Sequence, residues 1–173
     1  MLTLSLLRHA KSSWDDPALE DHERPLAPRG EKAAPLIGRH IAHEKLTPDL
    51  VLCSTALRTH QTLALVLLEL KTKPADIVYD DRLYLATPAA MTARLSELGS
   101  EPRHVMLVGH NPGFHALALE LVRGGSKPAV ARLARKFPTG ALAVIDFHDT
   151  DSWSALRPAT GTLRTFTAPK DLG

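Results

Sequence analysis

Residues 6–13 read LLRHAKSS, and they close an apolar run, LTLSLL at residues 2–7, that predicts a buried first strand. Three basic residues, Arg8, His9 and Lys11, follow this strand almost without interruption. A strand core gains nothing from basic side chains at its exit, because burying an unpaired charge is expensive. The stretch therefore predicts a strand that delivers cations to something outside the core.

The composition is that of one globular domain. The chain has 173 residues, of which 44% are hydrophobic and 23% are charged, so we expect residues 1–173 to form a single domain. The net charge is only +2 and 5% of the residues are aromatic, which is unlike a nucleic-acid-binding protein. The single cysteine, Cys53, excludes an internal disulfide and a cysteine metal cluster.

The sequence has the features of neither a membrane span nor a leader. No segment approaches the roughly 18 apolar residues that a membrane helix needs. The N-terminus has neither the basic region nor the cleavage site of a signal peptide. We therefore expect a cytoplasmic protein without a membrane partner.

Apolar runs and helical patterns alternate along the chain. Strands are predicted at residues 2–7, 49–54, 76–81, 103–111, 140–147 and 162–167, and helices at residues 30–44, 56–70, 87–98, 112–122 and 129–136. Strands separated by helices of this length predict a three-layer α/β/α fold with a central, mainly parallel sheet. Thr55 and Thr87 are predicted N-caps. Pro35 predicts a kink, or a later start, for its helix.

Ligands of such sheets bind beyond the carboxyl ends of the strands. Arg8 and His9 follow the first predicted strand, Arg58 lies at the start of the helix after the second, and His110 lies at the end of the fourth. Arginines suit a phosphate or a carboxylate, and a cluster of cations without an anion repels itself. The sequence therefore predicts a site for a dianionic ligand at this edge.

The same residues indicate a chemistry. A neutral imidazole is a nucleophile at neutral pH, so a histidine of this cluster is suited to attack phosphorus. Arg8, Arg58 and the second histidine would then stabilise the charge on the equatorial oxygens. The product would be a phosphohistidine, which water hydrolyses. This scheme requires no metal and no cofactor, because the arginines supply the charge neutralisation that Mg²⁺ supplies in other sites.

Five segments resemble one family, in order, along almost the whole chain: LLRHAKS, DHERPLAPRG, PDLVLCSTALRTHQT, VMLVGHNPG and FPTGALAVIDF. The chain resembles the histidine phosphatase superfamily, and within it the small SixA-type branch of phosphohistidine phosphatases. The resemblance implies a phosphoglycerate mutase-like fold with His9 as the nucleophile. It also implies a phosphate pocket formed by Arg8, Arg58 and His110.

The sequence lacks both acids that wider members of the superfamily use. Mutase-like members carry a glutamate just after the third strand, where residues 82–88 read RLYLATP, and acid phosphatases carry His-Asp where this chain has His110-Asn111. Loss of a positioned acid costs an alkoxide leaving group ~10²–10⁴-fold in rate. A leaving imidazole needs less help. The expected substrate is therefore phosphohistidine on a phosphorylated protein, or another activated phosphoramidate.

Four further residues near the nucleophile are candidates for the site. Lys11 and Ser12 could donate hydrogen bonds to a phosphate oxygen. Asp16 or Asp21, in the long loop after the first strand, could replace the missing acid. The alternative is that these carboxylates are solvated or form salt bridges with loop arginines.

Other conspicuous residues have structural interpretations. We expect Arg24 and Arg29, in the segment ERPLAPRG, to pin the long loop and to open the following helix. Trp14 is expected at the mouth of the site and Trp153 in the core. The histidines outside the cluster lack any shared spacing, whereas a zinc site needs an organised set of three or four ligands.

Two alternative functions remain open at this point. One is a broad small-molecule phosphomonoesterase, in which a loop aspartate would act as the acid. The other is a phosphate-binding module that has lost catalysis and docks phosphorylated proteins. A retained nucleophile, His9, argues against the second alternative, because binding alone needs only the arginines.

Overall fold

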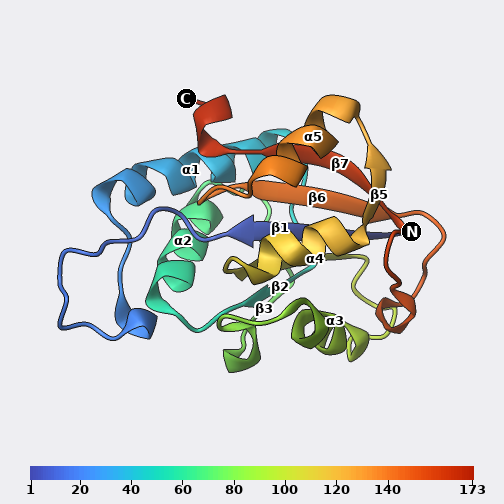
Figure 1. The fold of residues 1–173 in the computed structure, drawn as a ribbon, viewed down its shortest axis with the longest axis horizontal. Coiled ribbons are helices and arrows are strands. Elements are labelled where there is room, and N and C mark those ends of the chain that lie inside the picture. Colours follow the sequence, from blue (N-terminus) through green and yellow to red (C-terminus); the bar gives the residue numbers. More distant parts are fainter.

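A computed structural model describes all residues, 1–173, and shows one seven-stranded sheet in the order β3-β2-β4-β1-β6-β7-β5 (Figure 1). The strands are β1 (Leu2–Arg8), β2 (Leu50–Cys53), β3 (Asp76–Tyr79), β4 (His104–Gly109), β5 (Val122–Gly125), β6 (Leu142–Phe147) and β7 (Gly161–Thr167). The α-helices are α1 (Pro28–His43), α2 (Leu57–Leu68), α3 (Pro88–Ser96), α4 (Gly113–Leu121) and α5 (Lys127–Arg135).

The sheet is mainly parallel. Strands β3, β2, β4 and β1 pair in parallel, and so do β5 and β7. Only β6 runs the other way, since it pairs antiparallel with both β1 and β7. The predicted fold class is therefore confirmed. In the register of β1 and β4, Arg8 lies beside Gly109, so the residues that follow the two strands emerge together.

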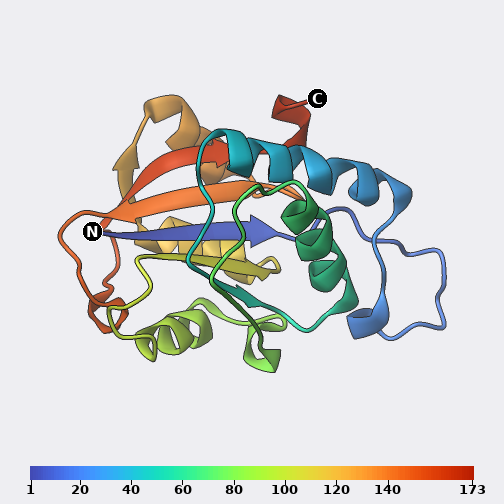
Figure 2. The same ribbon diagram turned by 180° about the vertical axis from the view of Figure 1, so that it is seen from behind.

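Helices cover both faces of the sheet, which gives three layers. Side chains of α3, α4 and α5 pack with Leu4 and Leu6 of β1 in one apolar cluster. Side chains of α1 and α2 pack with Leu7 in a second cluster on the other face (Figure 2). Strand β1 is almost entirely buried, as expected of a central strand covered on both sides. None of the helices combines the length and apolarity needed to cross a membrane.

Several element boundaries differ from the sequence predictions. Strand β5 was not predicted, and it begins at the last residue of the predicted helix 112–122. Its sequence, VRGG, contains two glycines and so lacks the alternation of apolar and polar residues that indicates a strand. Helix α5 begins two residues earlier than predicted, because the Ser126 hydroxyl accepts from the amide of Ala129 and caps it. Helix α1 also begins early, and it continues through Pro35 rather than starting after it.

The two predicted N-caps have different outcomes. Thr87 is confirmed, because its hydroxyl accepts a hydrogen bond from the amide of Ala90 in the first turn of α3. Thr55 as a cap is wrong: Ala56 occupies that position before α2 and makes no side-chain cap. The Thr55 hydroxyl donates instead to Asp81, so a tertiary contact replaces the local one. Trp153 is fully buried, as predicted.

The long segment between β1 and α1 is ordered by contacts with α2. Two side chains of α2 accept hydrogen bonds from this segment: Thr62 from the amide of Ala10 at 3.0 Å and Gln61 from the amide of Leu26 at 2.8 Å. A bridge between Ser12 and Leu26 closes the segment on itself. The short helical turn η1 (Asp21–Glu23) lies within it.

Gly30, in the first turn of α1, allows the helix to approach this segment. A Cβ atom there would lie 2.2 Å from the carbonyl oxygen of Lys11. Alanine normally stabilises a helix by about 1 kcal/mol relative to glycine, but this backbone clash would force α1 away. We expect Gly30→Ala to lower the free energy of unfolding by about 1–3 kcal/mol, measured by urea denaturation.

Gly124 provides a matched control, since a Cβ there meets no atom within 4 Å. Gly124→Ala is expected to change the free energy of unfolding by no more than about 0.5 kcal/mol. Equal stability of the two variants would contradict the proposed close approach at Gly30.

Candidate active site

His9 directly follows β1 and is buried, with 7% of its surface exposed. Its Nδ1 atom lies 2.7 Å from the carbonyl oxygen of Ala10. A carbonyl oxygen only accepts hydrogen bonds, so Nδ1 carries the hydrogen in the neutral ring and Nε2 carries the lone pair. The backbone therefore fixes the tautomer in which Nε2 keeps its lone pair.

His110 directly follows β4 and lies against His9, with 5.4 Å between the two ring centroids. A guanidinium nitrogen of Arg58 lies 3.3 Å from Nδ1 of His110, and the Ser54 hydroxyl lies 2.8 Å from Nε2. Because a guanidinium only donates, Nδ1 accepts and the Nε2 hydrogen is donated to Ser54. Ser54 follows β2 and Arg58 lies in α2, so two strand ends and one helix define the orientation of this ring.

Arg58 lies in the first turn of α2, and its side chain is 3% exposed. It donates to the backbone oxygen of Asp21 at 2.7 Å and to the carboxylate of the same residue at 3.0 Å. Arg8, at the end of β1, donates to the carbonyl oxygen of Phe137 at 2.8 Å. The structure thus brings together the four residues that the sequence predicted: Arg8, His9, Arg58 and His110.

Three guanidinium groups at this edge have unused donors. The Nε atoms of Arg8, Arg24 and Arg58 are buried and have no hydrogen-bond partner among the 173 residues. Buried donors are nearly always paired in native proteins, so each such exception needs an explanation. Positively charged donors without partners fit an anionic ligand.

Burial and neighbouring positive charge keep both histidines neutral. Burial, together with the charges of Arg58 and Arg8, lowers the pKa of His9 to about 4. Burial, together with Arg58 and His9, lowers the pKa of His110 to about 3. Burial and the charge of Arg58 also lower the pKa of Arg8. At neutral pH the predicted nucleophile is therefore an uncharged imidazole, as nucleophilic attack requires.

Asp21 is the carboxylate at the centre of this cluster. It forms ion pairs with Arg58 at 3.0 Å and with Arg24 at 3.4 Å, and it accepts a hydrogen bond from the hydroxyl of Tyr84. Burial alone would raise its pKa, but the hydrogen bonds from Tyr84 and Arg58 and the charges of Arg58 and Arg24 outweigh burial and lower it. Asp21 is therefore ionised at neutral pH, which disfavours it as a proton donor.

The other candidates lie in different settings. Asp16 is exposed and accepts from the amide of Ala18, which closes a local turn outside the cluster. Ser12 is buried, and its hydroxyl accepts from Arg24. Lys11 is exposed and lines a cavity together with Arg8.

The two arginines of the segment ERPLAPRG have separate environments. Arg24 is buried, and its contacts with Ser12 and Asp21 pin the loop as predicted. Arg24 also lies 3.3 Å from the centroid of the exposed Trp14 ring. Arg29 makes no hydrogen bond and no ion pair through its side chain, so the pinning role predicted for it is wrong; it lies on the exposed side of the first turn of α1.

Sequence reasoning missed two residues of the cluster. Tyr84 contacts His110 edge to face, with 5.5 Å between ring centroids, and it binds Asp21. It lies in residues 82–88, a segment that drew notice in the sequence only because it lacks a carboxylate. Ser54 orients His110, and its position as the last residue of the predicted strand 49–54 was the available signal. No group of three or more histidine, cysteine, aspartate or glutamate side chains is arranged to hold a metal ion.

The layered fold and this cluster of histidines and arginines define a phosphoglycerate mutase-like α/β protein. The family model of the histidine phosphatase superfamily (branch 1) matches residues 4–84. An uncharacterized protein of Mycobacterium tuberculosis is 37% identical over 166 residues, which cover 95% of this chain and 100% of that relative. The chain belongs to the histidine phosphatase superfamily, and it is of the SixA type.

Solved structures support the same assignment. A protein of Nakamurella multipartitia, assigned as the phosphohistidine phosphatase SixA, matches with a TM-score of 0.81 and 33% identity, over 97% of this chain and 96% of that one. The protein histidine phosphatase SixA complexed with tungstate matches with a TM-score of 0.79 and 25% identity, over 99% and 100%. These neighbours support the assignment of this chain as a phosphatase.

The lowered pKa values of the histidines predict a pH-dependent stability. Between pH 6.5 and 4 the unfolded chain binds more protons at His9 than the folded chain does, so the free energy of unfolding falls as the pH falls. Between pH 7 and pH 5, we expect the free energy of unfolding of the wild type to fall by about 1–2 kcal/mol more than that of His9→Gln. Urea denaturation in phosphate-free buffer measures this difference.

His43→Gln, at an exposed position of α1, is the control and is measured beside His9→Gln. An unchanged pH dependence in His9→Gln would contradict the neutral, buried state of His9.

The contacts of Asp21 predict competition with an anionic ligand. Asp21→Asn removes a negative charge that lies against Arg58. We expect the inhibition constant of tungstate or inorganic phosphate, measured on aryl phosphate hydrolysis, to fall about three- to tenfold. This size is in keeping with a partly exposed ion pair, worth about 1 kcal/mol or less. Asp16→Asn, in the same loop but outside the cluster, should leave the inhibition constant unchanged. Weaker inhibition of Asp21→Asn would show that Asp21 instead helps to bind the anion.

Proposed function

We propose that this protein is a protein phosphohistidine phosphatase that forms a covalent phosphoenzyme on His9. The observation that carries the proposal is the fixed tautomer of His9, whose Nδ1 hydrogen is donated to Ala10 while Nε2 keeps its lone pair among arginines. A module that only binds phosphate would need the arginines but not an oriented, neutral imidazole. The phosphatases among the structural neighbours support the same reaction class.

In the first step, Nε2 of His9 attacks phosphorus and a new P–N bond forms. The P–N bond to the substrate imidazole breaks, and its electron pair stays on the leaving nitrogen, which takes a proton from solvent. The modified ring carries a positive charge, and its Nδ1 hydrogen remains bonded to the carbonyl of Ala10. Arg8 and Arg58 stabilise the negative charge on the equatorial oxygens.

In the second step, water attacks phosphorus and the P–Nε2 bond breaks. The electron pair returns to His9, which regains its neutral tautomer, and inorganic phosphate leaves. Because the phosphorylated ring is positively charged, it leaves as a neutral imidazole, which is a good leaving group, so this step also proceeds without a strong acid. The scheme uses no metal, because arginines supply the positive charge.

The surroundings of the site favour a nitrogen leaving group. Asp21 is ionised at neutral pH, as argued above. Asn111, which stands where acid phosphatases have aspartate, donates its side-chain amide to the carbonyl of Phe137 at 3.0 Å. Neither residue is suited to protonate an alkoxide. An imidazole leaves with less help, so phosphohistidine on a protein is the substrate class that fits this site.

The proposal predicts a large preference among substrates. We expect the protein to hydrolyse a phosphohistidine peptide with a kcat/KM at least about 100-fold above that for an alkyl phosphate, since no positioned acid assists the alkoxide. Incubation with labelled substrate, followed by rapid alkaline quench, should trap phosphate on His9. His9→Ala should lose both the trapped label and turnover.

His43→Ala, on the exposed face of α1, is the matched control and should keep both properties. Equal rates on alkyl phosphates and phosphohistidine would instead favour a broad phosphomonoesterase. Turnover without any label on His9 would refute the covalent mechanism.

A further inference from the structure

The cavity that Lys11 and Arg8 line has a volume of about 360 Å³ and adjoins the candidate active site. Arg8 belongs to both, since it contacts the cluster around His9 and also lines this cavity. The remaining cations that line the cavity come from distant segments: Lys11 after β1, Arg29 in α1, Lys136 after α5 and Lys170 in the C-terminal turn. Figure 1 shows that α1 and the C-terminal turn lie side by side.

The charges in this cavity are not balanced within the protein. No carboxylate lines it, and none of its five cationic side chains takes part in any of the ion pairs of the molecule. Elsewhere the protein pairs its arginines closely, as Arg94 and Asp80 show at 2.6 Å. Cations gathered without a counter-charge repel one another, and an anion bound between them removes that cost.

The positive surface continues away from His9. A neighbouring cavity of about 300 Å³ shares Lys136, Pro138 and Lys170 with the first, and it adds Arg135. Arg132 and Asp171 also line it, and they pair with each other. The two cavities form one groove with an excess of cations, the basic groove, which we define by Lys11, Arg29, Arg135, Lys136 and Lys170. Two adjoining cavities of about 360 Å³ and 300 Å³ offer more room than a single phosphate or carboxylate requires.

We propose that the basic groove binds acidic side chains that flank the phosphohistidine in the polypeptide substrate. This proposal rests on the proposed function, because Arg8 joins the groove to the phosphoryl site. An extended acidic segment matches both the sign of the charge and its spread over two adjoining cavities. Exposed lysines and arginines give such contacts specificity and faster encounter rather than great affinity.

Two phosphohistidine peptides of equal length test the proposal, one with glutamates beside the phosphohistidine and one with glutamines. We expect the acidic peptide to have about a tenfold higher kcat/KM at low salt, and the preference to shrink as salt is added. In the triple variant Arg29→Gln, Lys136→Gln, Lys170→Gln the two peptides should become nearly equal. Hydrolysis of a small aryl phosphate should stay at the wild-type rate.

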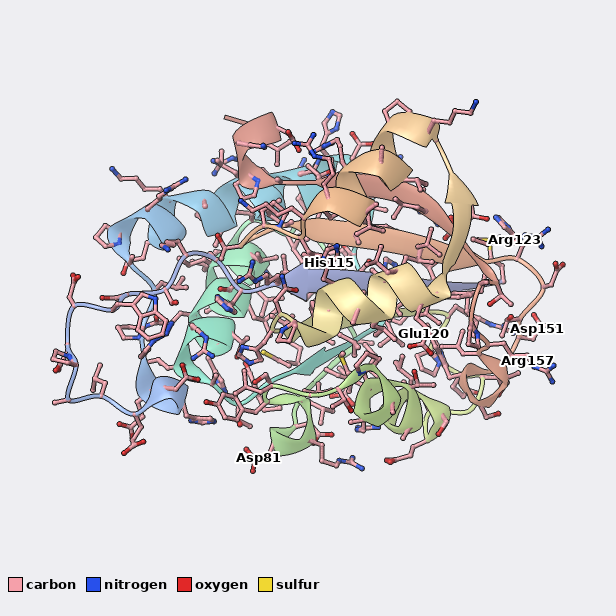
Figure 3. All side chains as sticks on the ribbon, in the orientation of Figure 1. Asp81, His115, Glu120, Arg123, Asp151 and Arg157 are labelled. Atoms are coloured by element: carbon pink, nitrogen blue, oxygen red, sulfur yellow. The ribbon has the colours of Figure 1, made fainter.

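A second triple variant, Lys71→Gln, Arg123→Gln, Arg157→Gln, removes the same number of charges elsewhere. Arg123 and Arg157 lie beside Asp151 at the far end of the sheet (Figure 3), and Lys71 is exposed just before β3. This control should keep the preference for the acidic peptide. Equal kcat/KM for both peptides in the wild type, a preference that survives in the groove variant, or its loss in the control would each overturn the proposal.

If the proposed function is wrong, the measurements differ from those expected if only the groove proposal is wrong. If the wild type hydrolyses the aryl phosphate but neither peptide, phosphohistidine is not its substrate. The groove is then measured by inhibition of aryl phosphate hydrolysis with an unphosphorylated acidic peptide and with tripolyphosphate. Inhibition by the peptide that weakens about tenfold in the groove variant supports an acidic polypeptide ligand. Inhibition by tripolyphosphate alone overturns it and identifies the ligand as a small polyanion.

Discussion

Three guanidinium groups, those of Arg8, Arg24 and Arg58, meet at one edge of the sheet, and the single carboxylate of Asp21 offsets them. This excess of positive charge acts together with burial on the protonation of the groups around it. Burial is the largest cause of the lowered pKa of His9 and His110, and the neighbouring arginines lower both pKa values further. The hydrogen bonds from Tyr84 and Arg58 and the charges of Arg58 and Arg24 lower the pKa of the Asp21 carboxyl. The site is therefore suited to an anion, and burial together with the charges that would bind that anion keeps its imidazoles neutral.

The loop that carries Asp21 depends on the helix that carries Arg58. Gln61 and Thr62, one turn after Arg58, hold the backbone of Leu26 and Ala10. The Thr62 hydroxyl in turn donates to the carbonyl oxygen of Arg58 at 2.7 Å. The start of α2 therefore does two things: Arg58 lies in the cluster around His9, and its neighbours Gln61 and Thr62 fix the loop beside that cluster.

The sequence could predict what depends on strand order and local pattern. Apolar runs located β1 and β4, and the rule on carboxyl ends then brought His9 and His110 to one edge. It could not predict Tyr84 in the cluster, because an isolated tyrosine after a strand has no distinctive spacing. Nor could it predict the outcome for Thr55, whose hydroxyl contacts Asp81 rather than the helix that follows it.

The sequence could not predict the basic groove, for a related reason. Three of its cations, Arg29, Lys136 and Lys170, are more than 30 residues apart along the chain and follow no common pattern. Tertiary packing, including that of the C-terminal turn beside α1, brings them together. Local patterns of charge thus identified the arginines at strand exits but not the surface that extends from them.

The charge excess also limits the chemistry of the site. A general acid must hold a proton near neutral pH, whereas the hydrogen bonds from Tyr84 and Arg58 and the charges of Arg58 and Arg24 lower the pKa of the nearest carboxyl group. Arg58 therefore acts on both groups: together with burial it lowers the pKa of His9, and it disfavours Asp21 as a proton donor. Asn111 cannot compensate, since an amide does not release a proton and is already bonded to the carbonyl of Phe137. The proposed preference for a leaving group that departs as an imidazole thus rests in part on the arginines.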